Sequence, residues 1–213
     1  MKLYDYFRSS AAFRVRIALN LKGLAPERAF VHLRKGDQRA DEYLSLNPQG
    51  LVPSLVTDDG TVLTQSLAIM EWLDETHPQP PLLPRDAAGR ARVRSIALAI
   101  ACDIHPIDNT RVLSYLTGTL GATDEQRNGW YKYWIDVGLE AIETRLAREA
   151  ATGRFCHGDR PTLADICLVP QLANARRVAF DFTPYPTLTR IEAACLALPS
   201  FADAVPAKQP DAE

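Results

Sequence analysis

The chain has 213 residues, of which 46% are hydrophobic, and its formal net charge at pH 7 is −2. This size suits one compact unit or two small domains, and the near-neutral charge excludes the basic field that nucleic acid or an acidic membrane surface attracts. No apolar run is long enough to span a bilayer, and charged, strand-like sequence follows Met1 in place of a signal peptide. The four cysteines show neither C-x-x-C spacing nor a metal-ligand pattern with the four histidines. We therefore expect no metal site and a reduced, cytoplasmic protein.

Strand and helix patterns alternate through the first part of the chain. Asp58-Asp59-Gly60 between two β-rich runs predicts a hairpin. The expected strands are Lys2–Tyr6, Arg28–Leu33, Ser54–Thr57 and Thr61–Leu63, and the expected helices are Ala11–Lys22, Asp41–Leu46 and Ser66–His77. Such alternation predicts a small α/β domain.

The pattern changes after a proline-rich stretch, Pro78–Pro84, which cannot continue a helix and predicts an extended linker. Apolar stripes at helical spacing then run over Val93–Ile107 and Trp130–Ala141. Thr162 and Asp165 have the spacing of a capping box and predict the start of a third helix. This part of the chain is therefore predicted to be all-α.

Prolines and polar residues predict irregularities in the helical part. Pro106 and Pro170 fall within predicted helices and should bend them. The segment from Pro206 onward is polar and is expected to be loose. The predicted domains are an α/β domain over residues 1–80 and an all-α domain over residues 85–213.

A pair of hydroxyls, Ser9-Ser10, lies where the first strand leads into the first helix. A helix start offers unpaired N–H groups and the positive end of the helix dipole, which stabilise an anion or a thiol that ionises. Serine is also a preferred N-cap, whether or not it takes part in chemistry. From this motif alone, the capping and the anion-binding interpretations both remain open.

Two more motifs have the same double interpretation. Val52-Pro53 precedes a predicted strand. A cis peptide bond there would turn the Val52 backbone outward, where it could pair with an extended peptide. The alternative is an ordinary trans proline at the start of the strand, with no binding role. Gln65-Ser66 lies where a hairpin strand enters a helix, and it predicts either a carboxylate site or a plain N-cap at Ser66. Each motif alone is weak evidence.

Together these features resemble the glutathione transferase family, and most closely its zeta class, the maleylacetoacetate and maleylpyruvate isomerases. The resemblance extends over nearly the whole chain. The motifs that carry it include Tyr6-Phe-Arg-Ser-Ser, Asn47-Pro-Gln-Gly-Leu-Val-Pro, Gln65-Ser-Leu-Ala-Ile, Cys102-Asp-Ile-His-Pro, Gly158-Asp-Arg-Pro-Thr-Leu-Ala-Asp and Gln209-Pro-Asp.

The resemblance implies the glutathione transferase architecture: an α/β thioredoxin-like N-terminal domain that binds glutathione and an all-α helical C-terminal domain that completes the substrate pocket. It implies that Ser9 hydrogen-bonds the glutathione sulfur and favours its thiolate. By position, the residues implied to bind the rest of glutathione are Ser10, Ala11, Gln38 at the glycine end, Val52 with a cis Pro53 at the cysteinyl backbone, Gln65 and Ser66 at the γ-glutamyl carboxylate, and His105 and Asn109 from the helical domain.

One departure from the family pattern concerns the reacting sulfur. Family members often carry cysteine directly after the serine pair, where this chain has Ala11. A protein thiol at that turn is thereby excluded, so the sulfur must come from glutathione.

The reaction implied by the resemblance is isomerisation of a maleyl double bond by thiolate addition, rotation and elimination. A dianionic substrate calls for cations, because guanidinium binds carboxylates with paired hydrogen bonds. The candidates by position are Arg8, Arg111 and Arg177, although the sequence leaves open whether Arg176 or Arg177 faces the pocket. Arg14 and Arg16 are expected to serve structure, one of them in a salt bridge or in helix packing.

Three functions compete at this point. The first is a glutathione-dependent isomerase of maleylacetoacetate or maleylpyruvate in aromatic catabolism. The second is a broader glutathione transferase that conjugates or dehalogenates electrophiles, and the third is a non-catalytic interaction module with this fold. The partners implied are a small-molecule substrate and a second copy of the chain in a homodimer, with neither nucleic acid nor membrane.

Overall fold

The computed structural model describes residues 1–213 and divides into two compact units. Unit 1 comprises Met1–Leu82 together with Ala197–Glu213, and unit 2 comprises Leu83–Leu196. The break near residue 82 falls within the predicted proline-rich linker. The segment from Ala197 onward differs from the expectation, because the sequence placed it in the helical domain and the structure packs it with unit 1.

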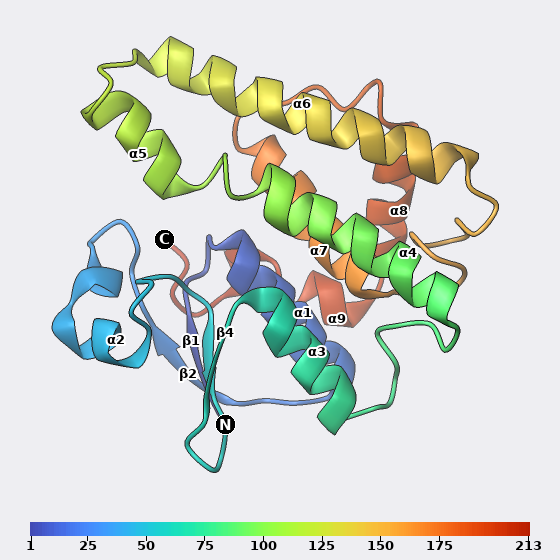
Figure 1. Ribbon diagram of the computed structural model, residues 1–213, viewed down its shortest axis with the longest axis horizontal. Helices are drawn as coiled ribbons and strands as arrows, with labels where there is room; N and C mark the ends of the chain where they lie inside the picture. The colour runs from blue at the N-terminus through green and yellow to red at the C-terminus, as the bar shows by residue number, and fades with distance from the viewer. The chain divides into compact units, whose positions relative to one another are not determined.

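Unit 1 contains a mixed four-stranded sheet (Figure 1) with the strand order β2-β1-β3-β4. Strand β1 pairs parallel with β2 and antiparallel with β3, and β3 forms the predicted hairpin with β4. Gly60 in the hairpin turn has a φ of 86°, which glycine adopts without strain. The strands are β1 (Lys2–Asp5), β2 (Glu27–Phe30), β3 (Ser54–Val56) and β4 (Val62–Thr64).

Short helices surround this sheet, and the longer two, α1 and α3, pack against each other. Helix α1 begins after Ser9 and ends at Gly23, whose φ of 67° closes the last turn. The helices of unit 1 are α1 (Ser10–Lys22), α2 (Asp41–Leu46), α3 (Ser66–Thr76) and α9 (Pro199–Ala202), with short 3₁₀ turns η1 (Asp37–Arg39) and η3 (Pro206–Lys208).

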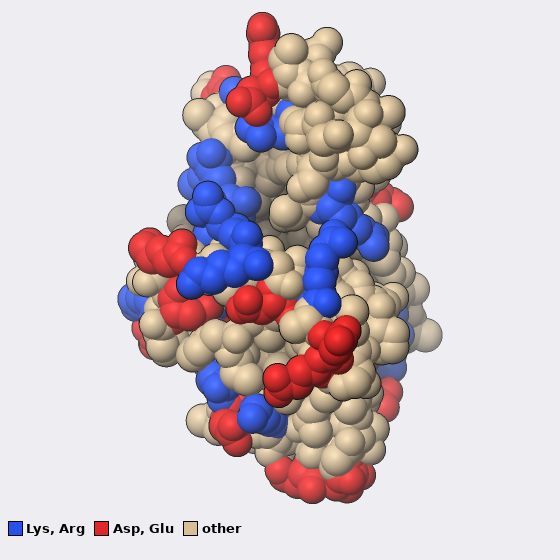
Figure 2. Space-filling model, turned by 90° about the vertical axis from the view of Figure 1, so that its left-hand side faces the viewer, with Lys and Arg blue, Asp and Glu red and all other residues tan.

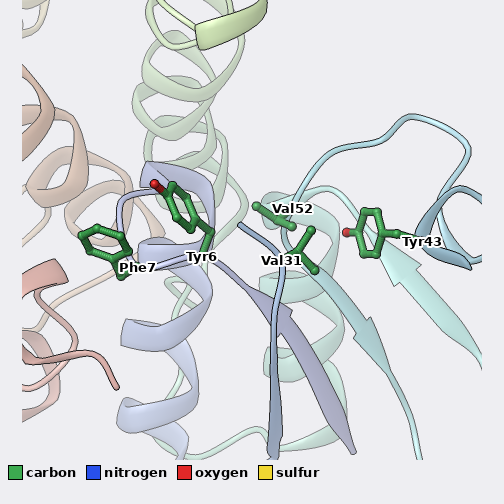
Figure 3. Close-up of a cluster of buried hydrophobic side chains, with 5 residues drawn as sticks. All are labelled: Tyr6, Phe7, Val31, Tyr43 and Val52. Carbon is green, nitrogen blue, oxygen red and sulfur yellow. The ribbon is translucent and has the colours of Figure 1, made fainter. Parts of the chain in front are cut away.

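Two buried clusters stabilise unit 1. Apolar side chains of β1, β3, α1 and α3 form the main core, in which Leu3, Leu55, Ile69 and Met70 are fully buried. A second, smaller cluster lies near the end of β1 (Figure 3) and consists of Tyr6, Phe7, Val31, Tyr43 and Val52.

Arg14 and Arg16 are both buried, as their predicted structural role requires. Arg16 forms an ion pair, the first of the two expected alternatives, with its Nη1 2.8 Å from Oδ1 of the fully buried Asp5. Arg14 donates from Nη1 to Oγ of Ser66 over 3.3 Å, which links α1 to the start of α3. These contacts fix the two helices that begin at the predicted site.

Unit 2 is all-α, as predicted. Helix α7 is its centre, because nearly all of its side chains are buried and it packs against both α4 and α8. The predicted capping box at its start is present, with the Thr162 N–H donating to Asp165 Oδ2 over 2.7 Å. The helices are α4 (Ala87–Leu98), a π-helical turn η2 (Ala99–Ile104), α5 (Thr110–Gly118), α6 (Asp124–Arg148), α7 (Leu163–Arg176) and α8 (Pro186–Leu196).

The predicted bend at Pro106 is a helix end instead. Helix α4 continues into η2, where the His105 N–H donates to Ile100 O over 3.0 Å, and the chain then turns before α5. Proline lacks the N–H that a continuing helix needs, which explains the end. Pro170 does lie inside a helix, α7, as predicted.

The segment from Pro206 onward was expected to be loose but is held by hydrogen bonds. The Gln209 side chain is buried and donates to Asp203 O and Val205 O over 3.0 and 2.8 Å. Basic and acidic side chains are interspersed over the face in Figure 2, in keeping with the small net charge. None of the helices has the length and apolar character that crossing a membrane demands.

Candidate active site

Strand register brings three of the predicted motifs to one end of the sheet in unit 1. Tyr4 near the end of β1 pairs with Ser54 at the start of β3, and Ser54 pairs with Thr64 at the end of β4. The loop after β1, the residues before β3 and the residues after β4 therefore lie at the same end. The motifs in those places are Ser9-Ser10, Val52-Pro53 and Gln65-Ser66.

Ser9 is the N-cap of α1, and its Oγ accepts from the Ala12 N–H over 3.1 Å. The Ser9 N–H donates to Tyr6 O over 2.9 Å, which turns the chain from strand to helix. Because Oγ accepts in the cap, its own hydrogen remains to be donated to an anion. The capping and anion-binding interpretations are thus compatible. Ser10 and Ala11 form the first turn of α1, whose N–H groups face the same end.

The Val52–Pro53 peptide bond is cis, as the resemblance implies. Val52 precedes the first residue of β3, so its backbone N–H and C=O take no part in the sheet. Its side chain is buried in the smaller cluster (Figure 3), which fixes the segment. An extended peptide could therefore pair with this backbone.

Gln65 adopts a left-handed backbone with a φ of 68°, which is uncommon outside glycine and concentrates at functional sites. Gln65 is the N-cap of α3, and Ser66, which the sequence predicted as the cap, is the first helical residue. The Gln65 Nε2 donates to Gln49 Oε1 over 2.9 Å. This start of α3 presents amides and a hydroxyl together, a suitable arrangement for a carboxylate.

Gln38 in η1 lies against the segment that leads to Val52. Gly50 has a φ of 60°, and a Cβ there would approach Gln38 O to 3.0 Å, so glycine permits the close contact. Oε1 of the Gln38 side chain is buried without a hydrogen-bond partner. An unsatisfied buried acceptor at this place indicates a missing donor, such as a bound ligand.

The candidates in unit 2 lie around the turn between η2 and α5. His105 directly follows η2, and Asn109 is the N-cap of α5, where its side chain accepts from the Arg111 N–H over 3.2 Å. This cap uses the amide oxygen of Asn109 and leaves its NH₂ group to donate. Arg111 is exposed on the first turn of α5.

Arg176 and Arg177 have different surroundings in unit 2. Arg176 forms a two-pronged ion pair with the buried Glu192, and its guanidinium also lies 4.6 Å from the centre of the Phe182 ring. Arg177 follows α7 and is exposed. The Glu192 ion pair commits Arg176 within unit 2, and Arg177 stays the substrate candidate that the resemblance named.

Asp108 is a notable group that the sequence did not single out. Its carboxyl lies between His105 and Asn109 in the chain, is buried, and has no hydrogen-bond partner at either oxygen. Burial disfavours the charged form and raises the pKa of Asp108 to about 7. An aspartate in a polar turn sequence normally indicates solvent exposure, so no local signal could have revealed this burial.

Comparison with known sequences decides the family. The pattern of the glutathione S-transferase N-terminal domain matches residues 8–76, and that of the C-terminal domain matches residues 135–204. The chain belongs to the glutathione S-transferase family. It is also 52% identical, over 99% of its length and 97% of the relative's, to a probable maleylacetoacetate isomerase of Vibrio cholerae.

Solved glutathione transferases share the fold over the whole chain. The holo structure of a maleylpyruvate isomerase, a bacterial zeta-class transferase, is 50% identical, covers 100% of both chains and superposes with a TM-score of 0.97. A maleylacetoacetate isomerase from Anaeromyxobacter dehalogenans, with dicarboxyethyl glutathione and citrate bound in its active site, is 46% identical and has a TM-score of 0.87. It covers 100% of this chain and 97% of its own. The predicted glutathione transferase architecture is thereby confirmed.

The residues of unit 1 fit glutathione, the cofactor of this family. The tripeptide has an extended backbone, carboxylates at both ends and a thiol between them. The matching groups are the unpaired backbone of Val52, the amides at the start of α3 for a carboxylate, the buried unsatisfied oxygen of Gln38, which can accept a peptide N–H, and the Ser9 hydroxyl at the start of α1 for the thiol.

Proposed function

We propose that this protein is a glutathione-dependent cis–trans isomerase that converts maleylacetoacetate or maleylpyruvate to the fumaryl isomer. The observation that carries the proposal is the set of motifs at one end of the sheet, with Ser9 at the start of α1. A purely structural module would have no need of all these motifs together. About half of the sequence is identical to relatives that bear these isomerase names.

Glutathione, when bound, supplies a thiolate that adds to the maleyl double bond and makes it a single bond, which can rotate before the thiolate leaves again. The role of Ser9 in the proposal is to donate its O–H to that sulfur, while the first turn of α1 adds the positive end of its dipole. A free thiol has a pKa of about 8.5 and is mostly protonated at neutral pH. Lowering it by about two units corresponds to roughly 2.7 kcal/mol and makes the thiolate the main form.

The remaining site residues hold the tripeptide. Val52 offers backbone pairing to the cysteinyl residue, and Gln65 and Ser66 bind the γ-glutamyl carboxylate at the start of α3. Gln38 donates or accepts at the glycine end, and Ser10, Ala11 and Pro53 shape the groove beside them. From unit 2, we assign His105 and Asn109 to the same cofactor.

Ala11 decides whose sulfur reacts. It is the second residue of α1, next to the turn where the N–H groups favour a thiolate. Alanine offers no nucleophile at this turn, so the reacting sulfur in this proposal is that of glutathione. The protein therefore depends on added glutathione.

The arginines are proposed to bind the carboxylates of the substrate. Arg8 precedes Ser9, Arg111 lies on the first turn of α5, and Arg177 follows α7. The relative with dicarboxyethyl glutathione and citrate in its active site supports a preference for polycarboxylates. Guanidinium groups recognise such ligands with paired hydrogen bonds.

The direct experiment is turnover of maleylacetone and maleylpyruvate by the purified protein with and without glutathione. We expect isomerisation of at least one of them, and none when glutathione is omitted. Absence of turnover with both, alongside good conjugation of an aryl or alkyl halide, would replace the isomerase proposal by a general transferase. The relative rates on the two maleyl compounds identify the substrate.

Arg177 and Arg176 provide a matched pair of variants. Arg177→Ala should raise KM for the dianionic substrate about tenfold, because one charge-assisted contact is lost. Arg176→Ala should instead lower the thermal midpoint, because it leaves the buried Glu192 without its ion pair. If Arg177→Ala raised KM equally for a neutral electrophile, Arg177 would not be a ligand of the substrate carboxylates.

We further propose that the protein is a cytoplasmic homodimer that serves aromatic catabolism. Its similarity to the zeta class supports these assignments. Light scattering on the purified protein tests the oligomeric state, and a mass equal to one chain would contradict the dimer.

A further inference from the structure

The loop that carries Arg8 and Ser9 is supported by residues from the far end of the sequence. This loop, Tyr6–Ser9, joins β1 to α1 and has no regular structure of its own. Ser9 can act on a sulfur only if the loop keeps its hydroxyl at the start of α1 within hydrogen-bond reach. The contacts that hold the loop therefore bear on catalysis.

Both polar groups of the Phe7 backbone are occupied. The Phe7 N–H donates to Oδ2 of Asp211 over 2.9 Å, and the Phe7 C=O accepts from Nη2 of Arg16 over 3.0 Å. Arg16 also donates to Tyr6 O over 3.4 Å, and Tyr6 O accepts the Ser9 N–H. The position of Ser9 is thus tied to hydrogen bonds on either side of Phe7.

Asp211 is itself anchored through its neighbour Gln209. Gln209 is buried, and its Oε1 accepts from Nη2 of Arg28 over 3.1 Å, while Arg28 also pairs with the buried Asp5. Asp5 in turn holds Arg16. The segment that carries Asp211 is therefore held in place by hydrogen bonds and ion pairs.

The same segment also touches the loop that leads to Gln38. Glu213 lies 2.5 Å from Nε2 of His32, just after β2. The His32 Nδ1 accepts from the Lys35 N–H, so Nε2 carries the hydrogen and donates it to Glu213. The His32 N–H donates to Asp37 in η1, next to Gln38. Residues 209–213 thus join two of the loops assigned to glutathione.

We propose that residues Gln209–Glu213 position the glutathione site and that Asp211 is the positioning residue for Ser9, through the backbone of Phe7. Asp211 touches neither cofactor nor substrate in this proposal. Its carboxylate keeps the Tyr6–Ser9 loop in the conformation in which the Ser9 hydroxyl meets the sulfur. The proposal rests on the proposed role of Ser9.

The test compares the pH at which the thiol of bound glutathione ionises, followed by thiolate absorbance at saturating glutathione, in Asp211→Ala and in wild type. We expect this pH to rise by about one unit in Asp211→Ala, because the sulfur loses a well-placed donor. We expect kcat to fall about tenfold, as misplaced groups cost rate. Asp211→Asn should restore most of both properties, because its amide oxygen accepts the same N–H.

Asp203→Ala is the matched control. Asp203 lies in the same part of unit 1, but its side chain pairs only with the exposed Lys208. It should change neither the thiol ionisation nor kcat.

An unchanged thiol ionisation in Asp211→Ala, even with a lower thermal midpoint, would overturn the proposal and leave Asp211 a purely structural residue. Equal losses in Asp211→Asn and Asp211→Ala would overturn the hydrogen-bond mechanism. If wild type ionises bound glutathione but fails to isomerise maleyl substrates, the proposed reaction fails while this inference is still tested by the thiol measurement.

Discussion

Ser9 combines a structural and a chemical task in one hydroxyl. Its Oγ accepts from the Ala12 N–H as the cap of α1 and retains a hydrogen for the sulfur. Ser9→Ala should therefore raise the pKa of bound glutathione and lower kcat about 10²-fold, as the loss of one preorganised donor does elsewhere. The measurements are thiolate absorbance against pH and steady-state kinetics.

A control is needed because losing an N-cap alone costs about 1 kcal/mol of stability. Thr123 caps α6 in the same manner, accepting from the Gln126 N–H over 3.2 Å, and is not assigned to the site. Thr123→Ala should destabilise the protein to a similar degree without changing the thiol pKa. An unchanged thiol pKa in Ser9→Ala would remove Ser9 from the chemistry and leave it a cap.

Asp108 predicts a pH dependence of stability. Burial raises the pKa of Asp108 from its ordinary 3.8 to about 7. Between these values the folded state binds a proton that the unfolded state releases, so the free energy of unfolding falls as the pH rises through this window. Asp108→Asn should remove that decline and make the variant more stable than wild type at pH 8. Urea midpoints at pH 5 and pH 8 measure both effects.

Asp103→Asn is the control variant, because Asp103 is exposed and lies in η2, shortly before Asp108. It should leave the fall in the free energy of unfolding between pH 5 and pH 8 unchanged. If wild type and Asp108→Asn lose stability in parallel between pH 5 and pH 8, the Asp108 carboxyl is already ionised in the folded protein.

At the scale of elements, the sequence predicted most of unit 1 because the signals there are local. The Asp58-Asp59-Gly60 turn fixes the hairpin, and Ser9 fixes the start of α1 within one residue of the expectation. The site motifs could be placed for the same reason, since each lies next to a strand or helix end. Gln65 as the cap of α3 was missed, because its left-handed backbone is set by the packing around it and not by its own preference.

The helix around Pro106 shows where local signals fail. The apolar stripe predicted one regular helix to Ile107, whereas α4 changes at Ala99 into the π-helical turn η2, which ends at Ile104. This turn packs against α6, and the fit depends on Gly138, because a Cβ there would collide with the Ile104 side chain. Such a contact joins residues far apart in the chain and has no pattern in either segment alone.

Gly138→Ala should therefore destabilise the protein although alanine favours helix. Overpacking typically costs about 1–3 kcal/mol, which exceeds the gain of about 0.5–1 kcal/mol from replacing glycine inside a helix. Gly129→Ala in the same helix is the control, since a Cβ there meets nothing within 4 Å, and it should stabilise the protein. Thermal midpoints of both variants decide the matter, and a stabilised Gly138→Ala would contradict the close packing of η2 on α6.

At the scale of the whole chain, the segment from Pro206 onward is what the sequence could least predict. Its polar composition indicates a solvated tail, yet Gln209 and Asp211 bond to Arg28 and Phe7, close to the start of the chain. Composition reports average burial and carries no information on such distant partners. Unit 1 is therefore complete only with both ends of the sequence, and removal of residues 209–213 should affect the site of Ser9 more than unit 2.

Glutathione should stabilise the folded chain, because its proposed ligands come from segments that only folding brings together. The backbone of Val52, the start of α3 at Gln65 and the Gln38 loop meet at one end of the sheet, whereas the unfolded chain holds them apart. A ligand at about 100 times its dissociation constant adds roughly 2.7 kcal/mol to the free energy of unfolding.

The thermal midpoint should thus rise with glutathione concentration, and Gln65→Ala should need more glutathione for the same rise. An equimolar mixture of glutamate, cysteine and glycine should produce no rise, since no connected backbone is available to pair with Val52. A midpoint that glutathione leaves unchanged would contradict the assignment of these residues to the cofactor.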